Sequence, residues 1–291
     1  MKDQRMEIKP YFSILVVCLN PGDKLEGTLN SIRKQSFHDY EVIVKDGGST
    51  DGSPESIKEL FTAWKQENGR VSLKLIEKKD AGIYDAMNQA ATAAAGCYVY
   101  YLNCGDHFHS NHVLADMAEF TERRKLLNPG VPGIYYGDIY ERLTGQVVAS
   151  NPKMDAFGCY RNVPCHQACF YTRELLLAHP FETKYRVRAD YEQFLWCFFA
   201  NGFENGVEFV HQELLIADYE GGGFSETKEN RRISATEHKE ITRKYMSAGQ
   251  LFKFKAVMLL SLAPLRTWIA QNEKTAGIYN RVKSLVYSRR R

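Results

Sequence analysis

The sequence predicts an α/β protein with a doubly wound, mostly parallel sheet. Apolar runs rich in β-branched residues recur through the first hundred residues, and segments with helical spacing separate them. The runs lack alternation, which is typical of strands covered on both faces. Polar or glycine-rich turns follow several of them. Strands and helices that alternate at this spacing predict parallel neighbours in one sheet.

The first strand and helix are the clearest elements. Residues 12–19 form a continuous apolar run and predict a strand. The turn at residues 20–23 ends the strand. Leu25, Leu29 and Ile32 then follow the 3.6-residue period of a helix that buries one face.

The next elements repeat this order. Residues 40–45 predict a second strand, which runs into a glycine turn. Ser53 is expected to cap the following helix, because its hydroxyl can accept from the first turn, and Pro54 suits the first helical position. The remaining elements of this half are a strand at residues 71–77, an alanine-rich helix at 83–95 and a strand at 98–102.

Beyond residue 128 the pattern changes. The expected elements are a hairpin of residues 134–143 and 146–149, a helix at 189–200, a strand at 207–216 and a charged helix at 228–246. We therefore expect one α/β domain at residues 1–225 and a basic, amphipathic helical extension at residues 226–291.

The C-terminal extension carries most of the positive charge. From Lys239 onward there are twelve Lys or Arg against two Glu, although the whole chain has a net charge of only +3. Residues 251–270 mix large apolar side chains with cations, and Pro264 is expected to kink them. This pattern favours a helix on an anionic membrane surface. A helix that packs on the main domain remains the alternative, and no nucleic-acid recognition motif accompanies the charge.

Membrane-spanning and secretory segments are not expected. The longest apolar run near the C-terminus lies between Lys255 and Arg266. It is too short to span a membrane, which requires about twenty apolar residues. The N-terminus is polar, and the seven cysteines contain no Cys-x-x-Cys pair. Reduced thiols in a cytoplasmic protein are the simplest interpretation.

Two acidic turns predict a ligand site. Asp46 ends a predicted strand beside glycines, and its carboxylate could accept from the ring N–H of a base. Asp80 and Asp85 flank the start of the helix at 83–95, where backbone N–H groups could bind phosphate or ribose. The alternative for each acid is a structural turn or a helix cap.

A metal site and a general base are predicted further along the chain. Asp106 follows the strand at 98–102, and its hard oxygens suit Mg²⁺ or Mn²⁺. Asp190 opens a helix, where it could act as a general base or merely as a cap. His166 with Cys159, Cys165 and Cys169 could hold zinc by ligand type, but the spacing is unusual. Hydrogen bonds from His166 and Gln167 to a substrate are the favoured interpretation.

Three segments resemble the opening of family 2 glycosyltransferases with the GT-A fold. They are Leu15-Val16-Val17-Cys18-Leu19-Asn20, Leu29-Asn30-Ser31-Ile32-Arg33-Lys34-Gln35-Ser36 and Glu41-Val42-Ile43-Val44-Lys45-Asp46-Gly47-Gly48-Ser49-Thr50-Asp51-Gly52. The stretch Asp80-Ala81-Gly82-Ile83-Tyr84-Asp85-Ala86-Met87-Asn88 is similar to a branch that serves bacterial capsule, O-antigen and exopolysaccharide assembly. The resemblance covers roughly residues 10–225.

The resemblance implies roles for individual residues. Asp106 would meet a Mg²⁺ or Mn²⁺ ion on the donor diphosphate, and Asp190 would be the general base of an inverting transfer. His166, Gln167 and Asp85 would contact donor or acceptor. The nucleotide would contact Asn20, Asp46, Gly48, Ser49, Asp80, Gly82 and Asn103.

The expected reaction moves a sugar from a nucleotide donor, expected to be a UDP-sugar, to a saccharide or lipid-linked saccharide. A lipid-linked acceptor would place the protein at the inner face of the plasma membrane. The chain departs from the family where Asn103 replaces the first carboxylate of Asp-x-Asp and where Ala189 replaces one acid beside Asp190. A non-catalytic nucleotide-sugar binding protein is therefore the alternative. A sugar-phosphate nucleotidyltransferase would need a glycine-rich basic loop after the first strand, which residues 20–23 lack.

Overall fold

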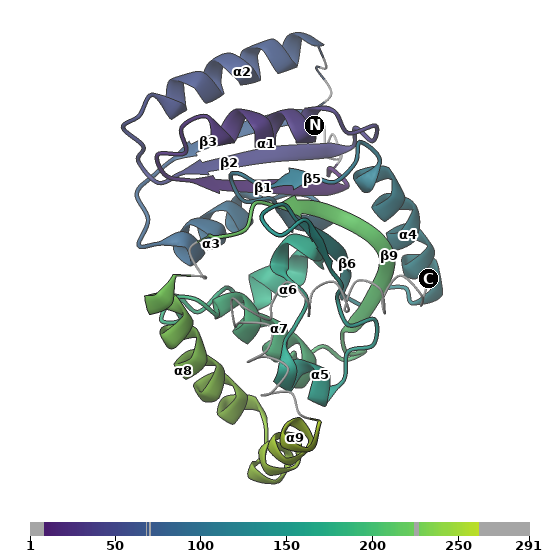
Figure 1. The fold of residues 1–291 in the computed structure, drawn as a ribbon. Coiled ribbons are helices and arrows are strands. Elements are labelled where there is room, and N and C mark those ends of the chain that lie inside the picture. The colour runs from purple at the N-terminus through teal and green to yellow at the C-terminus, as the bar shows by residue number, and fades with distance from the viewer. Residues whose placement is uncertain (1–8, 68, 70, 224–226, 262–291) are drawn as a thin grey trace, which may run out of the picture. The chain divides into compact units, whose positions relative to one another are not determined.

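The fold is described by a computed structural model that covers residues 9–67, 69, 71–223 and 227–261 (Figure 1). The chain divides into two compact units, Met1–Lys239 and Glu240–Arg291. The first unit contains the sheet. The division falls within helix α8 (Lys228–Tyr245), later in the chain than the boundary that we placed after residue 225.

The N-terminal half is the predicted parallel sheet. Its strands lie in the order β3-β2-β1-β4, and each adjacent pair is parallel. The strands are β1 (Phe12–Cys18), β2 (Tyr40–Asp46), β3 (Ser72–Glu77) and β4 (Tyr98–Tyr101). The helices between them are α1 (Lys24–Arg33), α2 (Ser53–Glu67) and α3 (Ile83–Ala93).

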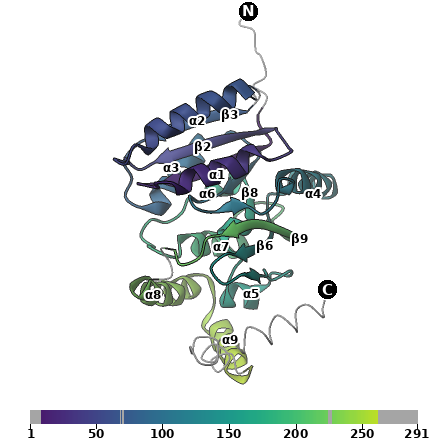
Figure 2. The ribbon, with the colours of Figure 1, turned by 45° about the horizontal axis from the view of Figure 1, so that its top comes forward.

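Helices cover both faces of this sheet, as the unbroken apolar strands predict. Phe12, Ile14 and Val16 of β1 share one buried cluster with Leu29 of α1 and Ile57 of α2. Figure 1 shows α1 and α2 both above β1 and β2, and Figure 2 shows the two helices running alongside β2. Helix α3 packs on β1 and β2 and connects β3 to β4, which lies on the other side of β1. This connection crosses the sheet in the opposite direction to the β1–β2 and β2–β3 connections. Because such crossovers are right-handed, the reversal places α3 on the opposite face of the sheet.

The second half extends the sheet with antiparallel pairings. The full order is β3-β2-β1-β4-β8-β6-β9-β5, with β7 paired to β6. Strand β8 is antiparallel to both β4 and β6, whereas β9 is parallel to β6. The added strands are β5 (His107–Phe108), β6 (Gly133–Glu141), β7 (Gln146–Val148), β8 (Cys169–Thr172) and β9 (Glu208–Tyr219).

The hairpin β6–β7 and the long strand β9 were expected from the sequence, and so was helix α7 (Ala189–Phe199). Three further helices were not predicted. They are α4 (Val113–Leu127), α5 (Ala156–Arg161) and α6 (Arg173–Ala178).

The start of α2 differs from the expected cap by one residue. The backbone N–H of Ser56 donates to the carbonyl of Gly52, so Gly52 rather than Ser53 takes the N-cap place. The side chain of Asp51 accepts from the N–H of Ser53 at 3.1 Å. The carboxylate of Asp51, two residues before Ser53, thus supplies the side-chain acceptor expected from the serine hydroxyl.

The second unit contains helix α9 (Ala248–Leu260), which opens with a capping box at Ser247. Phe252, Leu259 and Leu260 are 77%, 73% and 84% exposed. The predicted kink at Pro264 lies outside the described residues. Among the helices described, none combines the length and the apolar character that crossing a bilayer requires.

Candidate active site

A cavity of about 700 Å³ gathers five of the residues that the sequence singled out. They come from the turn after β4, the 3₁₀ segment before β8 and the first turn of α7. The five are Asn103, Asp106, His166, Gln167 and Asp190. The parallel strands end at this edge of the sheet, where α/β folds usually bind ligands.

Asp190 lies in the first turn of α7 and reaches the cavity with 23% of its side chain exposed. Tyr84 of α3 donates its hydroxyl to Oδ1 at 2.9 Å, and His166 Nδ1 lies 3.4 Å from Oδ2. Burial acts to raise the pKa of Asp190, but the interactions with His166 and Tyr84 outweigh it and hold the pKa below its ordinary value. The carboxylate is therefore ionised at neutral pH and able to accept a proton.

His166 links Asp190 to the end of β4. Its Nε2 lies 2.9 Å from the amide nitrogen of Asn103. The amide donates, so Nε2 accepts and Nδ1 carries the proton that faces Asp190; this tautomer follows from the hydrogen-bond partners. A chain of polar contacts thus crosses the cavity wall from Asn103 through His166 to Asp190 and Tyr84.

Asp106 occupies the tight turn after β4 and is only 3% exposed. Gly105 adopts a φ of +99°, which favours glycine, and Thr28 braces the turn by hydrogen bonds to Gly105 N and Asp106 O. The Asp106 carboxylate accepts from Gln167 Nε2 at 3.2 Å and from Glu220 N at 2.9 Å.

The environment of Asp106 suits a divalent cation. Burial raises the pKa of its carboxyl group, and the hydrogen bonds from Glu220 and Gln167 only partly oppose the shift. A buried carboxylate is stabilised by a bound cation, and carboxylate oxygens suit Mg²⁺ and Mn²⁺. Glu220, which also lines the cavity, brings a second carboxyl group to this region. Sequence reasoning missed Glu220, although an acid before three glycines at the end of a strand was a usable signal.

Asp46 ends β2 as predicted, but its carboxylate is engaged within its own turn. Oδ1 accepts from the N–H groups of Gly48 and Ser49, both at 2.8 Å, and the hydroxyl of Ser49 donates to Oδ2. The side chain is fully buried. Burial acts to raise the pKa of Asp46, yet these hydrogen bonds hold it below its ordinary value. The geometry fits a turn-organising role, and the contact with a base stays a prediction.

Asn20 joins the turns after β1 and β2. Its backbone N–H donates to Ser49 Oγ at 2.7 Å, and its Oδ1 accepts from Thr50 N at 2.8 Å. Asn20 has a φ of +48° and is exposed, as is Gly48. The turns after β1 and β2, which hold several of the residues predicted to meet a nucleotide, therefore form one connected polar edge.

A buried lysine ties Asp80 to this edge. Lys45 of β2 is fully buried, and its Nζ lies 2.8 Å from Asp80 Oδ2. The other oxygen of Asp80 accepts from Gly82 N at 3.2 Å, and Lys45 also donates to the carbonyl of Asp46. The family resemblance predicted that Asp80 lies near the nucleoside, but Lys45 was not identified as a site residue. The sequence of a strand does not show which of its cations will be buried beside an acid.

Asp85 does not belong to the residues that line the cavity in the described part of the chain. Its Oδ2 accepts from Ala81 N at 2.9 Å and from Gln89 Nε2 at 3.0 Å, so it braces the start of α3. This matches the structural alternative for Asp85, and a donor or acceptor contact stays a prediction.

The cysteines near His166 bond to the protein rather than converging on a common point. Cys165 donates to Gln167 Oε1 at 2.6 Å, and Cys169 donates to the carbonyl of Cys165. Burial raises the pKa of Cys159 and of Cys165 to about 12. Among the described residues, these thiols and His166 do not form a group of ligand atoms close enough to share one ion, which argues against the zinc alternative.

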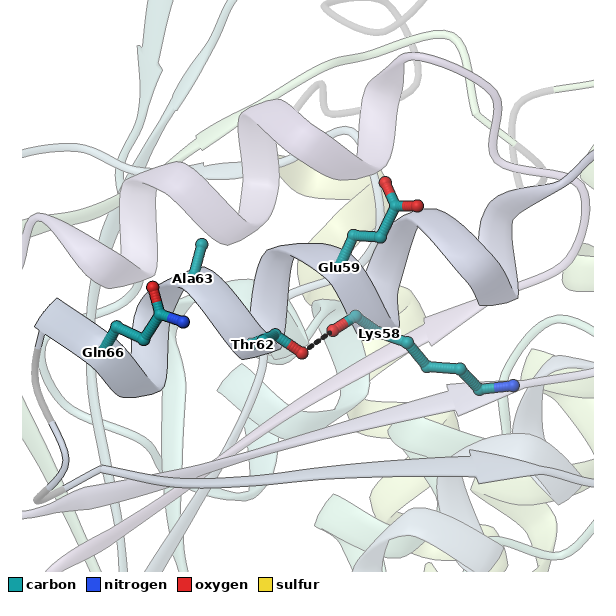
Figure 3. Close-up of a pocket in the computed structure, with 5 residues that line it drawn as sticks. All are labelled: Lys58, Glu59, Thr62, Ala63 and Gln66. Carbon is teal, nitrogen blue, oxygen red and sulfur yellow. Dashed lines mark hydrogen bonds between the residues drawn. The ribbon is translucent and has the colours of Figure 1, made fainter.

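A second, shallower cavity of about 390 Å³ lies on α2 (Figure 3). All five of its lining residues come from this one helix, and they are Lys58, Glu59, Thr62, Ala63 and Gln66. Figure 3 shows their side chains spread along the helix rather than directed at a common point, and Thr62 bonds the carbonyl of Lys58. The larger cavity is therefore the candidate active site.

Comparison with known proteins supplies independent information. The sequence model described as "Glycosyl transferase family 2" matches residues 13–176. A PGL/p-HBAD biosynthesis glycosyltransferase of Mycobacterium bovis is 32% identical over 220 residues, which are 75% of this chain and 80% of that protein. The hyaluronan synthase of Pasteurella multocida is 25% identical over 222 residues, 75% of this chain but 22% of the synthase.

Solved structures share the fold at lower identity. Residues 1–349 of S. aureus TarS, in complex with UDP-GlcNAc, give a TM-score of 0.59 at 17% identity over 85% of this chain and 71% of that one. A longer TarS structure is matched over 42% of its length. The Pyrobaculum calidifontis mannosyltransferase PcManGT, with GDP-Man and Mn²⁺, gives 0.55 at 16% identity over 96% and 88% of the two chains. These likenesses show the GT-A fold.

Proposed function

Because the chain belongs to the family 2 glycosyltransferases, we propose that it is an inverting, metal-dependent enzyme that uses a nucleotide-sugar donor. The observation that carries the proposal is the convergence of Asp190 and Asp106 on one cavity. One carboxylate is held ionised by its partners, and the other lies buried in the turn after β4.

Asp190 is the proton acceptor in this reaction. It removes the proton from an acceptor hydroxyl as the hydroxyl oxygen attacks the anomeric carbon of the donor sugar. The bond from that carbon to the diphosphate oxygen breaks, and the nucleoside diphosphate leaves with the bonding electron pair. Attack opposite the leaving group inverts the anomeric configuration. Tyr84 and His166 fix the orientation of the carboxylate.

Asp106 would hold Mg²⁺ or Mn²⁺, and the ion, when bound, neutralises charge on the departing diphosphate. Gln167 orients Asp106 through the hydrogen bond to Oδ2. The connected edge of Asn20, Ser49 and Asp80 binds the nucleoside. We assign UDP as the nucleotide. GDP, which accompanies mannose in the PcManGT structure, is the main competitor.

The acceptor is a saccharide or a lipid-linked saccharide of a cell-surface glycan. The mycobacterial relative is named as a glycosyltransferase of PGL/p-HBAD biosynthesis. Helix α9 exposes Phe252, Leu259 and Leu260 beside Lys253 and Lys255. Exposed apolar side chains with cations suit an anionic membrane surface, where a lipid-linked acceptor would lie.

The second candidate is a nucleotide-sugar binding protein without catalysis. It is favoured by Asn103, which stands where the family carries the first carboxylate of its metal motif. The two functions separate at Asp190. We expect Asp190→Asn to abolish turnover and to leave donor affinity within about twofold, because a general base acts on the acceptor side. Asp116→Asn, an exposed acid in the first turn of α4, is the matched control and should behave as wild type.

Calorimetric titration with UDP, GDP, dTDP and CMP, each with and without Mn²⁺, tests the donor site. We expect one diphosphate to bind in a Mn²⁺-dependent way, and Asp106→Ala to abolish that dependence. If none of the four binds, the donor site described above is wrong. Donor binding without turnover by the wild-type protein, over a panel of saccharide acceptors, would favour the binding protein instead.

A further inference from the structure

Glu220 is fastened to the candidate metal ligand by its own backbone. It follows β9 directly, and its N–H donates to Asp106 Oδ1 at 2.9 Å. Residues 106 and 220 are thus joined across 114 positions of sequence. Any movement of the Glu220 side chain takes place beside Asp106, because the backbone on which it pivots is held there.

The carboxyl group of Glu220 lies against the turn that presents Asp106. A Cβ placed on Gly105 would come within 2.7 Å of Glu220 Oε2. The side chain also lines the cavity and is 41% exposed. Because Gly105 has no side chain, the Glu220 carboxylate can occupy the space beside it.

Lys24 pairs with the Glu220 carboxylate. Its Nζ lies 2.8 Å from Glu220 Oε1 and 2.9 Å from Oε2, and the hydrogen bond with Glu220 raises the pKa of the lysine. Both side chains are substantially exposed, at 57% and 41%. Exposed pairs of this kind contribute little to stability, so the exchange of one partner for another costs little.

The neighbouring charges are mixed. Arg142 donates to the carbonyl of Gly105, and with Lys24 it places two cations beside the two carboxylates Asp106 and Glu220. If the two carboxylates bind a metal ion, Lys24 and Arg142 can then pair with a diphosphate. The set thus contains oxygen ligands for a divalent cation and positive charge for the phosphates that accompany it.

We propose that Glu220 is the second carboxylate ligand of the divalent cation held by Asp106, and that it substitutes for the family's first carboxylate, whose place Asn103 takes. When the cation binds, Lys24 leaves Glu220 and pairs with the donor diphosphate instead. The inference rests on the proposed function. Magnesium and manganese bind hard oxygen ligands, usually one or two carboxylates together with phosphates and water. A single carboxylate makes a weak site, and Glu220 supplies the missing charge from beside Gly105.

The test measures Mn²⁺ binding rather than turnover. Free Mn²⁺ is followed by its electron paramagnetic resonance signal during titration of the full chain, with and without UDP. We expect Glu220→Gln to weaken Mn²⁺ binding at least about tenfold, an effect of the size seen when the surroundings of a metal site are altered. Glu220→Asp, which keeps the carboxylate, should recover part of the affinity.

Two further variants make the result specific. Glu119→Gln removes an exposed carboxylate of α4 that pairs with Arg123 at 2.5 Å, and it should bind Mn²⁺ as wild type does. Lys24→Met removes the competing cation. Mn²⁺ alone should then bind at least as tightly as in wild type, whereas UDP in the presence of Mn²⁺ should bind more weakly.

The outcomes separate this inference from the function on which it rests. If wild type binds Mn²⁺ and Glu220→Gln binds it equally well, Glu220 is not a ligand, and the metal-dependent transferase stands. If wild type binds UDP but no Mn²⁺ under any condition, metal dependence and the role of Glu220 both fall. A gain of Mn²⁺ affinity in Glu220→Gln would also overturn the inference.

Discussion

Asp106 and Asp190 carry the same side chain under opposite physical conditions. Asp106 is buried with two hydrogen-bond donors, and burial dominates, so its pKa is raised. Asp190 is stabilised by His166 and Tyr84, and its pKa is lowered. In the proposed reaction the first carboxylate would bind a cation, and the second, which is ionised at neutral pH, would accept a proton. The environment rather than the residue type divides the two roles.

The raised pKa of Asp106 predicts that the site costs stability. The pKa of this carboxyl group is higher in the folded protein than in the unfolded chain. It therefore costs no stability below the unfolded pKa, and the fold loses stability as the pH rises from the unfolded pKa through the folded pKa. We expect Asp106→Asn, without added metal, to raise Tm at pH 7. The gain should shrink as the pH falls toward the ordinary aspartate value of about 4.

Thermal unfolding by circular dichroism between pH 4 and 8 measures this effect. Asp116→Asn, which changes an exposed acid, serves as the control and should leave the pH dependence unchanged. A lower Tm for Asp106→Asn at pH 7 would contradict the account. Loss of Mn²⁺ binding in the same variant separates function from stability.

The residues that line the cavity were only partly predictable. Asn103, Asp106, His166, Gln167 and Asp190 stand at strand ends or helix starts, where the local pattern marks them. The partners that tune them come from distant segments. Tyr84 donates to Asp190 across 106 positions, and Lys45 meets Asp80 because β2 and the loop after β3 lie side by side. Local pattern contains no information about such pairs.

At the scale of elements, the segment that leads into α7 is held by a buried acid of α8, Glu237. The Glu237 carboxylate accepts from the backbone N–H groups of Arg186, Val187 and Arg188, at 2.7, 3.1 and 2.9 Å. Glu237 is 8% exposed. These three residues lead directly into the first turn of α7, so Glu237 fixes the segment from which Asp190 projects.

We expect Glu237→Gln to lower the free energy of unfolding by about 1 to 3 kcal/mol, because a neutral amide leaves buried N–H donors without a charged acceptor. The same change should lower kcat about tenfold, since small displacements of a reacting group are costly. Urea unfolding and initial rates provide the measurements. Glu229→Gln changes an exposed acid of the same helix, paired with Arg186 at 3.0 Å, and should do neither.

Gly96 marks the close approach of the α3–β4 connection to β1. A Cβ at this position would lie 2.7 Å from the backbone carbon of Phe12 and from the backbone nitrogen of Ser13. Backbone of a central strand cannot move aside. We expect Gly96→Ala to lower the free energy of unfolding by about 1 to 3 kcal/mol in urea titrations.

The matched control for Gly96 is Gly249, within α9, where an added Cβ meets nothing within 4 Å. Gly249→Ala should be neutral or stabilising by up to about 1 kcal/mol, because alanine favours helix more than glycine does. If the two substitutions changed the free energy of unfolding equally, the close approach of Gly96 to β1 would not be the cause of the destabilisation.

At the scale of the whole molecule, charge is segregated toward the C-terminus. Twelve of the 38 Lys and Arg residues follow position 238, with only two acidic residues among them. Where the structure describes this region, α9 exposes large apolar side chains beside lysines. Together these features predict attraction to anionic lipid.

Co-sedimentation with phosphatidylglycerol and phosphatidylcholine vesicles tests the attraction. We expect the full chain to bind the anionic vesicles preferentially and to lose this binding as salt rises. Truncation after Gly249 should reduce binding at least about tenfold, since each basic residue near the surface contributes about 1 kcal/mol. Lys125→Gln, which removes a cation from α4, should bind as the full chain does. Unchanged binding by the truncated protein would refute the proposal.

The sequence by itself determined the succession of strands and helices along the first half of the chain and most of the acids at the strand ends, and its resemblance to a family indicated the GT-A fold. Apolar period and turn chemistry are local properties, so they can be read along the chain. Tertiary structure decided which acids lie together and with what partners. Asp46 became a buried turn organiser, Asp190 gained Tyr84 and His166, and Glu220 came to lie beside Asp106. Pairing of distant segments sets burial and charge at each site, and those long-range contacts leave no local pattern.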